Sequence, residues 1–346
     1  YKYDKGENLK AALYKGNQTF SVEEIPTPKP NVNEVLIKVN LSAICGTDVH
    51  AFMYDLAPPE TVLGHEFTGE VVEIGSNVTK LSIGDIVVGG GGTPPPGQEL
   101  PQKILPRYNY RKMGFVPEKT RAYAEYTLLP EWNPIKVPDG VSEKQAAMCE
   151  PTAVAIHAIR NSKLKLGDSV LVIGAGPIGL LTIQACAAAG ADKIYVSEPS
   201  LTRQNLAKKL GATKVLSPSV NNIENEVVEL TDGIGPDVIF DCAGFPQTLD
   251  LAFNTVRRNG QVILVAVPWE IIPLEPADWM AREISFKSSW GSDPINWHNA
   301  LNLMKSGKID IDMMTENNKY ITLDKIQETF EGLMKPTDQG QIIIKF

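Results

Sequence analysis

The sequence predicts an α/β protein that combines a doubly wound parallel sheet with a second, mainly β domain. Three observations carry this prediction. The 346 residues exceed the ~250–300 residues that a single hydrophobic core usually serves. From residue 166 onward, buried-strand runs alternate with helix-length apolar runs, which is typical of a parallel sheet with helices on both faces. The part before residue 150 instead consists of short β-branched runs divided by Gly and Asn.

The composition excludes several classes of protein. The chain has 33 basic and 41 acidic residues, a net charge of −8, which disfavours nucleic-acid and anionic-membrane partners. The four cysteines, Cys45, Cys149, Cys186 and Cys242, lie far apart and predict no disulfide framework. The polar start YKYDKGENLK has no apolar core of a secretory signal, so we expect a cytoplasmic protein.

The first domain is predicted to be mainly β. The runs EVLIKVNLSAI, GEVVEIGSNV and SIGDIVVGG have the β-branched content of strands and end at turn residues. The run GGGGTPPPG then begins at Gly89, and residues 90–121 are rich in Pro and aromatic residues. This segment, which we call the 90–121 lobe, is expected to be a long loop or a small lobe.

The second domain is predicted from five strand-like runs, GDSVLVIGAG, KIYVSEP, KVL, DVIFDCAG and QVILVAV, with helix-length segments between them. The alternation fades after about residue 294, so the tail is expected to pack back onto the first domain. The predicted boundaries are therefore residues 158–295 for the parallel sheet domain, and residues 1–157 with 296–346 for the discontinuous, mainly β domain.

A glycine-rich turn is the strongest local signal. Gly174, Gly176 and Gly179 follow a strand and open a helix, where they allow a tight turn, close approach of a pyrophosphate and close helix packing. Glu198 ends the next strand, and a carboxylate there would bond the adenosine ribose and repel a 2′-phosphate, which predicts NAD over NADP. Arg203 lies nearby and would instead accept that phosphate. The plain alternative is a glycine-rich turn without a ligand.

A second group of residues suits a metal. Cys45 opens the motif CGTDVH, His65 and Glu66 follow, and Glu150 comes directly after Cys149. A thiolate, an imidazole nitrogen and a carboxylate oxygen are ligands that zinc accepts, and a catalytic zinc needs three of them with one position open. Taken singly, Cys45 as a small core residue and His65 as a buried polar group would be the plainer interpretation.

These motifs, in this order, resemble the medium-chain zinc-dependent alcohol and polyol dehydrogenases over almost the whole chain. CGTDVH is similar to the threonine dehydrogenases, whereas EPTAVAIHA, from Glu150 on, is more similar to the sorbitol and butanediol dehydrogenases. The resemblance implies a GroES-like catalytic domain joined to a Rossmann domain, one catalytic zinc, NAD as cofactor, and a homodimer or homotetramer.

The resemblance also implies roles for individual residues. Cys45 and His65 would be zinc ligands, Glu66 a ligand or a close neighbour that takes part in catalysis, and Glu150 a ligand directly or through a water. Thr47 and His50 match the proton-relay positions. The cofactor-binding positions would be Gly174, Gly176, Pro177, Ile178, Gly179, Glu198, Arg203, Val265, Val267, Ser289 and Trp290.

One departure from the family is plain. Many members carry four closely spaced cysteines for a structural zinc in the 90–121 lobe, and this chain has no cysteine there, so we expect one zinc per chain. A solvated loop, a subunit contact and a rim that favours an anionic substrate such as a polyol phosphate all remain open for this lobe. Its basic residues are Lys103, Arg107, Arg111, Lys112, Lys119 and Arg121.

The function implied is oxidation of a secondary alcohol, in a polyol, diol or sugar alcohol, with transfer of the hydride to NAD. Oxidation of L-threonine is the alternative within the family. Two alternatives from other classes are an NAD-binding module without catalysis and a zinc-free reductase. The retention of Cys45, His65, Glu66, Glu150 and Thr47 argues against both.

Overall fold

The structure is a computed structural model that describes residues 8–99, 121–315, 320–335, 338 and 340–346. The described chain divides into two compact units. Unit 1 holds the described residues up to Glu150, those between 318 and 337, and Gln341–Phe346. Unit 2 holds the described residues of Pro151–Asn317 and of Asp338–Gly340.

Unit 1 is mainly β, as the β-branched runs predict. One sheet has the order β2-β1-β4, and the other has the order β15-β16-β3-β5-β6-β8, with β7 also paired to β3. The elements are β1 (Asn8–Gly16), β2 (Thr19–Pro26), β3 (Glu34–Ala43), α1 (Gly46–Met53), β4 (Thr61–Val62), β5 (Glu66–Ile74), β6 (Ile86–Val88), β7 (Tyr126–Pro130), β8 (Ile135–Lys136), α4 (Glu143–Ala147), β15 (Tyr320–Ile321), the 3₁₀ helix η1 (Leu323–Lys325), α13 (Ile326–Leu333) and β16 (Ile343–Lys345).

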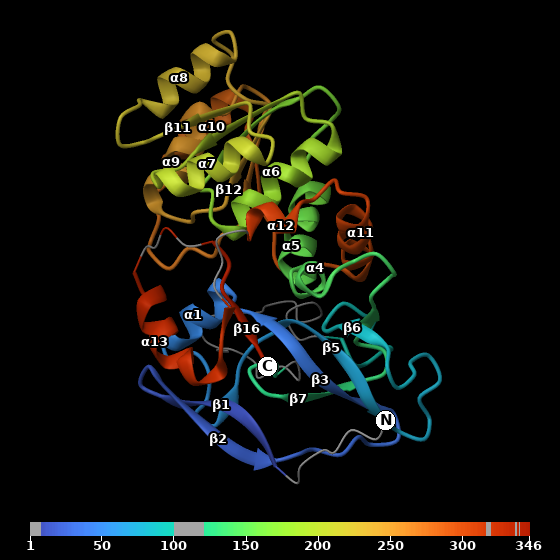
Figure 1. The fold of residues 1–346 in the computed structure, drawn as a ribbon. Helices are drawn as coiled ribbons and strands as arrows, with labels where there is room; N and C mark the ends of the chain where they lie inside the picture. The colour runs from blue at the N-terminus through green and yellow to red at the C-terminus, as the bar shows by residue number, and fades with distance from the viewer. Residues whose placement is uncertain (1–7, 100–120, 316–319, 336–337, 339) are drawn as a thin grey trace. The chain divides into compact units, whose positions relative to one another are not determined.

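An aromatic cluster holds α1 against the rest of unit 1. Phe52 of α1 stacks on Phe20 at 5.4 Å between ring centroids and meets Phe330 of α13 edge-on at the same distance. Figure 1 shows α1 and α13 side by side. Because aromatic pairs of this kind bury large apolar areas in a fixed geometry, the cluster fixes the position of α1 and of the turn that precedes it.

Unit 2 contains a six-stranded sheet of order β11-β10-β9-β12-β13-β14, in which every neighbouring pair is parallel. The elements are α5 (Cys149–Asn161, whose first two residues belong to unit 1), β9 (Ser169–Ile173), α6 (Pro177–Ala189), β10 (Lys193–Ser197), α7 (Leu201–Lys209), β11 (Lys214–Leu216), α8 (Ile223–Leu230), β12 (Val238–Asp241), α9 (Pro246–Thr255), β13 (Gln261–Leu264), α10 (Pro276–Arg282), β14 (Ser285–Ser288), α11 (Pro294–Lys305) and α12 (Ile311–Met314).

Helices cover both faces of this sheet (Figure 1). Leu171 and Ile173 of β9 pack into a core with residues of α8 and α9. Val170 and Val172 alternate with them along the strand, so they face the opposite side, and they are fully buried as well. A parallel strand buried on both faces is the arrangement that the continuous apolar run VLVI predicts.

The end of unit 2 differs from the expected boundary. The described residues of unit 2 continue to Thr315, whereas the fading alternation of strands and helices places the end of the domain near residue 295. The physical reason is that α11 buries Trp297 and Leu301, and that Asn296 lies 3.0 Å from Nδ1 of His157 in α5. Because no strand of the parallel sheet follows α11 among the described residues, the alternation of strands and helices ends before it, although α11 still packs on unit 2.

Candidate active site

The turn between β3 and α1 positions the first candidate metal donor. Cys45 is the N-cap of α1, and its Sγ accepts a hydrogen bond from the backbone N–H of Thr47 at 3.4 Å. A thiol in this position satisfies one of the free N–H groups at the start of the helix. The sulfur is therefore held at the end of a helix that the aromatic cluster fixes.

The first residue of β5 and the residue before it are the other two candidate donors. His65 and Glu66 follow Gly64, which has φ +95° and no room for a side chain, since an added Cβ would lie 2.6 Å from the ring of Tyr123. The ligand atoms of Cys45, His65 and Glu66 all lie within 4.8 Å of one another. The structure thus brings together three residues that the sequence analysis singled out.

This donor set fits zinc. Bonds of 2.0–2.3 Å in a tetrahedral site place donor atoms about 3.5 Å apart, so a small closure of the cluster would reach that geometry. Sulfur, nitrogen and oxygen donors in this combination are those that zinc accepts. Three protein donors leave one tetrahedral position open, as a catalytic zinc requires.

The electrostatics of the cluster also favour a cation. Burial, and then the charge of Glu66, raises the pKa of the Cys45 thiol to about 12. Burial and the charge of Glu150 raise the pKa of Glu66. Burial lowers the pKa of His65, but the nearby charges of Asp48 and Cys45 raise it more. The groups therefore retain protons because anionic charges crowd a desolvated space, and a divalent cation would relieve that repulsion.

Glu150 and Cys149 lie outside the three-residue donor cluster. Glu150 stands in the first turn of α5, and its charge is close enough to raise the pKa of Glu66. Cys149 is fully buried, and burial raises the pKa of its thiol. The sequence left open whether Glu66 or Glu150 is the third ligand. Glu66 is the one whose carboxylate oxygen lies close to the ligand atoms of Cys45 and His65.

Two residues that the sequence analysis missed surround the cluster. Asp48 is fully buried, and its Oδ1 lies 3.5 Å from Nδ1 of His65. Gln341 donates from Nε2 to Oε2 of Glu66 at 3.2 Å and to the carbonyl oxygen of Ile44 at 2.6 Å. Asp48 had a signal, an acidic residue inside the quoted motif CGTDVH, whereas Gln341 is 275 residues from Glu66 and had none.

The two expected proton-relay residues stand on α1. Thr47 and His50 are three positions apart, which places them on one face of the helix. Both are half-buried. Burial lowers the pKa of His50 to about 4, so its ring is neutral at pH 7.

The glycine-rich turn of unit 2 has the backbone that the motif predicts. Gly174 follows β9 and has φ +88°, and Gly176 is the N-cap of α6 with no side-chain bond to the helix start. Gly179 packs so closely on the turn that an added Cβ would lie 1.9 Å from the carbonyl oxygen of Gly174. Pro177 is the first residue of α6 and Ile178 the second. The free start of α6 suits a phosphate group.

Glu198 is directed at this turn. Its Oε2 accepts the N–H of Ala175 at 2.6 Å, and its Oε1 accepts the N–H of Ser200 at 2.8 Å. Arg203 of α7 reaches the same place, since its Nη1 lies 3.9 Å from the position of a Cβ at Gly176. Glu198 and Arg203 thus lie at the same turn. From the sequence, we expect them to have opposite effects on the choice between NAD and NADP.

The remaining expected cofactor residues follow strands β13 and β14. Val265 and Val267 come after β13, and Ser289 and Trp290 come after β14. Because the strands are parallel, these residues share the carboxyl edge of the sheet with the glycine-rich turn, where α/β proteins bind ligands. The buried Oγ of Ser289 has no hydrogen-bond partner among the described residues, which fits a polar group of a bound cofactor.

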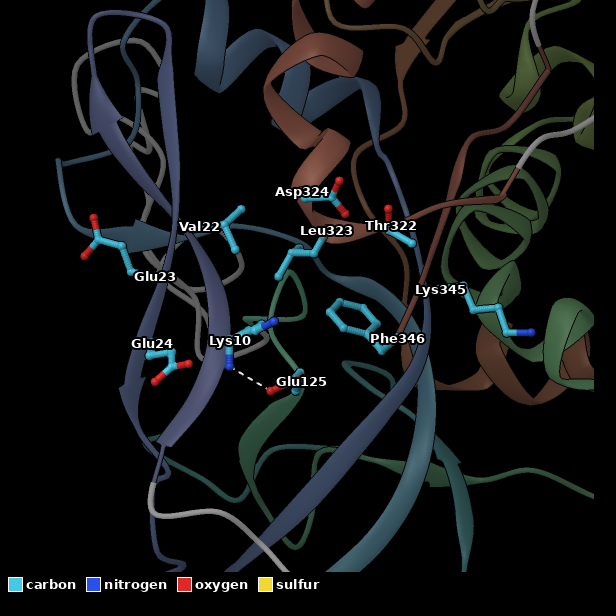
Figure 2. Close-up of a pocket in the computed structure, with 10 residues that line it drawn as sticks. All are labelled: Lys10, Val22, Glu23, Glu24, Glu125, Thr322, Leu323, Asp324, Lys345 and Phe346. Atoms are coloured by element: carbon cyan, nitrogen blue, oxygen red, sulfur yellow. Dashed lines mark hydrogen bonds between the residues drawn. The ribbon is translucent and has the colours of Figure 1, made fainter.

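The 90–121 lobe falls mostly outside the described residues, because residues 100–120 are not described. A separate hollow of about 450 Å³ lies in unit 1, and none of the three candidate metal donors lines it (Figure 2). In the figure the backbone N–H of Lys10 donates to Glu125 at 2.7 Å. The hollow is lined by Lys10, Val22, Glu23, Glu24, Glu125, Thr322, Leu323, Asp324, Lys345 and Phe346.

Comparison with known proteins identifies the family. A model described as "Alcohol dehydrogenase GroES-like domain" matches residues 31–139, and one described as "Zinc-binding dehydrogenase" matches residues 177–306. The (R,R)-butanediol dehydrogenase of Bacillus subtilis is 35% identical over 97% of this chain and 99% of that protein. The chain belongs to the medium-chain zinc-dependent alcohol dehydrogenase family. A crystal structure of the B. subtilis butanediol dehydrogenase matches the structure of this chain with a TM-score of 0.86, over 98% of this chain and 99% of the other.

Other members of the family carry different names. The L-threonine 3-dehydrogenase of Pyrococcus furiosus is 33% identical over 96% of this chain and 97% of that protein. The D-arabitol-phosphate dehydrogenase of Enterococcus avium is 33% identical over 92% of each chain. Membership confirms the predicted fold class, the oxidoreductase activity on alcohols, and zinc and a nicotinamide dinucleotide as cofactors. No helix among the described residues has the length and apolar character needed to cross a membrane.

Proposed function

We propose that this zinc-dependent dehydrogenase oxidises a secondary hydroxyl of a diol or polyol and transfers the hydride to NAD. The observation that carries the proposal is the cluster of Cys45, His65 and Glu66, whose ligand atoms lie within 4.8 Å of one another. The similarity to butanediol and arabitol-phosphate dehydrogenases supports the substrate class. Zinc, when bound there, supplies Lewis-acid chemistry that makes a hydroxyl more acidic.

The chain's own residues would hold the metal and accept the proton of the substrate hydroxyl. Cys45 is aimed by its bond from the Thr47 N–H, and Glu66 is aimed by Gln341. We propose Glu66 as the third ligand, with Glu150 outside it. The Thr47 hydroxyl would accept the substrate's hydroxyl proton, and the neutral His50 would pass that proton on rather than retain it, because its pKa is about 4.

NAD is the proposed dinucleotide, and it accepts the hydride from the carbinol carbon when bound. Glu198 brings a buried carboxylate to the glycine-rich turn, where it would accept bonds from the ribose hydroxyls and repel a 2′-phosphate. Ser289, Trp290, Val265 and Val267 are the proposed contacts on the nicotinamide side. The balanced reaction converts a secondary alcohol and NAD⁺ into a ketone, NADH and one proton.

The decisive experiment combines metal analysis with a substrate panel. Wild-type protein is expected to carry about one zinc per chain, Cys45→Ser to lose both zinc and activity, and the matched control Cys149→Ser to keep both. NAD reduction is then measured with a secondary diol, a polyol, its phosphate ester and L-threonine. A zinc-free but active wild type would overturn the metal assignment, and turnover of L-threonine alone would overturn the substrate class.

The ester arm of the panel tests the basic 90–121 lobe. The arabitol-phosphate dehydrogenase relative supports a phosphorylated substrate, since guanidinium groups bind phosphate oxygens strongly. If the lobe serves the substrate, kcat/KM for the ester should exceed that for the free polyol and should fall with salt. Equal values without salt dependence would leave a loop or a subunit contact as its role.

We further propose that a second copy of the chain pairs with β14. This edge strand is paired with β13 and with no other strand of the described part of the chain. Nearby apolar side chains are exposed, among them Ile271 (91%), Met280 (78%) and Phe286 (47%). Met280→Glu should lower the mass in light scattering, whereas Ile234→Glu, at an exposed site elsewhere, should not. An unchanged mass for Met280→Glu would contradict this interface.

A cytoplasmic location is proposed on separate grounds. All four cysteines are free, which fits a reducing compartment. The metal donor Cys45 requires the same condition, because a disulfide would remove the thiolate that binds zinc.

A further inference from the structure

The carboxylate of Asp48 has an unusual surrounding for a fully buried acid. Its Oδ2 accepts a hydrogen bond of 2.7 Å from the hydroxyl of Tyr123. Its Oδ1 has no hydrogen-bond partner within the described part of the chain, and it lies 3.5 Å from Nδ1 of His65. Buried carboxylates are costly unless donors surround them, so the direction of this group depends on the phenol on one side and the imidazole on the other.

Tyr123 is fixed more firmly than its single side-chain hydrogen bond suggests. Its backbone N–H donates to the carbonyl of Leu63 at 2.9 Å, and its carbonyl accepts the N–H of Ala12 at 2.8 Å. Its ring is fully buried and meets Phe330 edge-on, with 6.0 Å between centroids. Gly64 lies against the ring with no space for a side chain. The phenol oxygen is therefore a rigid point beside the segment that carries His65.

We propose that Tyr123 is a positioning residue for the metal site. Its hydroxyl holds Oδ2 of Asp48, so that Oδ1 faces Nδ1 of His65 and the opposite nitrogen, Nε2, faces the metal. The inference rests on the proposed zinc site of Cys45, His65 and Glu66. A carboxylate behind a histidine ligand fixes the ring orientation and the tautomer, and such partners affect metal affinity strongly.

A purely structural role would not require the hydroxyl. The packing around the ring is apolar, and phenylalanine has the same ring and would fill the same space. A second tyrosine shows the difference, since Tyr14 donates to Asp55 but Asp55 also accepts the N–H of Asn17 and so holds a turn. The carboxylate of Asp48 accepts no backbone N–H among the described residues, and the ionisable side chain beside its free oxygen belongs to His65.

The test is Tyr123→Phe, with Tyr195→Phe as the matched control. Tyr195 also donates one phenol hydrogen bond, to the carbonyl of Leu230 at 2.8 Å, but in unit 2. The zinc dissociation constant is measured by competition with a chelator, and the site is also examined by the absorption spectrum after replacement of zinc with Co²⁺. We expect Tyr123→Phe to weaken zinc binding about 3- to 10-fold and to shift the Co²⁺ bands, and Tyr195→Phe to change neither.

A second pair of variants tests whether the effect passes through Asp48. Asp48→Asn should weaken zinc binding about 10-fold or more, and adding Tyr123→Phe to it should have little further effect. An additive effect in the double variant, or wild-type zinc affinity in Asp48→Asn, would overturn the proposal, the latter even if Tyr123→Phe failed to fold. Unchanged affinity and spectrum in folded Tyr123→Phe would also overturn it while the zinc site stands. Absence of zinc from the wild type would instead refute the proposed function.

Discussion

The same small change at two glycines of one turn is expected to affect different properties: NAD binding alone at Gly176, and stability as well as NAD binding at Gly179. At Gly179, an added Cβ would lie 1.9 Å from the carbonyl oxygen of Gly174, more than 1 Å inside the closest approach that Cβ atoms make. At Gly176, the nearest atom would be Nη1 of Arg203 at 3.9 Å. Gly179 therefore serves the packing of α6 on β9, and Gly176 leaves space that a ligand can use.

Gly176→Ala should keep the fold and weaken NAD binding. The backbone at Gly176 has φ −64° and ψ −177°, which alanine adopts without strain. The methyl group would occupy the approach to the N–H groups at the start of α6. Loss of even one charge-assisted hydrogen bond of about 1.5–3 kcal/mol would weaken NAD binding at least about 10-fold. The melting temperature without NAD should stay within about 2 °C of wild type, as for a substitution that meets no neighbour.

Gly179→Ala should destabilise the protein itself. The helix and the turn must separate by about 1 Å, and overpacking of this kind costs about 2–3 kcal/mol. For a unit of this size, that cost lowers the melting temperature by about 4–12 °C. NAD binding should fall as well, because the turn that we expect to receive the pyrophosphate is displaced.

Thermal unfolding without NAD and calorimetric titration with NAD separate the two effects. Wild-type NAD affinity in Gly176→Ala would refute the close approach of the dinucleotide to this turn. An equal loss of melting temperature in both variants would refute the distinction drawn from the Cβ distances.

Three further substitutions test single side chains. Burial holds the pKa of His50 at about 4 against 6.5 in the unfolded chain, so only the unfolded state gains protons as the pH falls below 6.5. Urea unfolding at pH 7.5 and 5 should show wild type losing about 1–2 kcal/mol more than His50→Gln, after discounting for partial exposure, and equal losses would contradict this. Glu198→Gln keeps an acceptor for the turn but removes the charge, so the NADP:NAD ratio of kcat/KM should rise; an unchanged ratio would contradict the proposed cofactor choice. Burial raises the pKa of Asp237, but bonds from Ser169 and Arg257 lower it more, so its contribution is present at neutral pH and is lost as the pH falls through the lowered pKa. Asp237→Asn should therefore cost about 1–2 kcal/mol of unfolding free energy at pH 7 and less at pH 3, and an equal cost at both would refute it.

The parallel sheet could be predicted because its signals are local. The run VLVI, the glycine-rich turn and the helix after it lie within about 20 consecutive residues, and burial on both faces leaves a continuous apolar pattern. The end of unit 2 could not be predicted in this way. Whether α11 packs on unit 2 depends on contacts such as that of Asn296 with His157, 139 residues away, which leave no periodic trace in the sequence.

The candidate metal donors could be named from residue type, but their surroundings could not. Cys45, His65 and Glu66 are conspicuous because few side chains bind zinc. The phenol of Tyr123 reaches Asp48 across 75 residues, and the amide of Gln341 reaches Glu66 across 275. Tyrosine and glutamine have many roles, so only the fold shows that these two bond the groups around the metal site.

Charge balance explains why these surroundings matter. A thiolate at Cys45 and a carboxylate at Glu66 would together cancel the two positive charges of zinc, with His65 neutral. Asp48 then adds a buried carboxylate that the metal does not neutralise. A buried charge persists only where donors compensate it. The donors that face Asp48 would be the hydroxyl of Tyr123 and, with zinc bound at Nε2 as proposed, the Nδ1–H of His65. If zinc binds as proposed, zinc and the Tyr123 hydrogen bond would support the same carboxylate, and metal affinity would be coupled to a side chain that does not touch the metal.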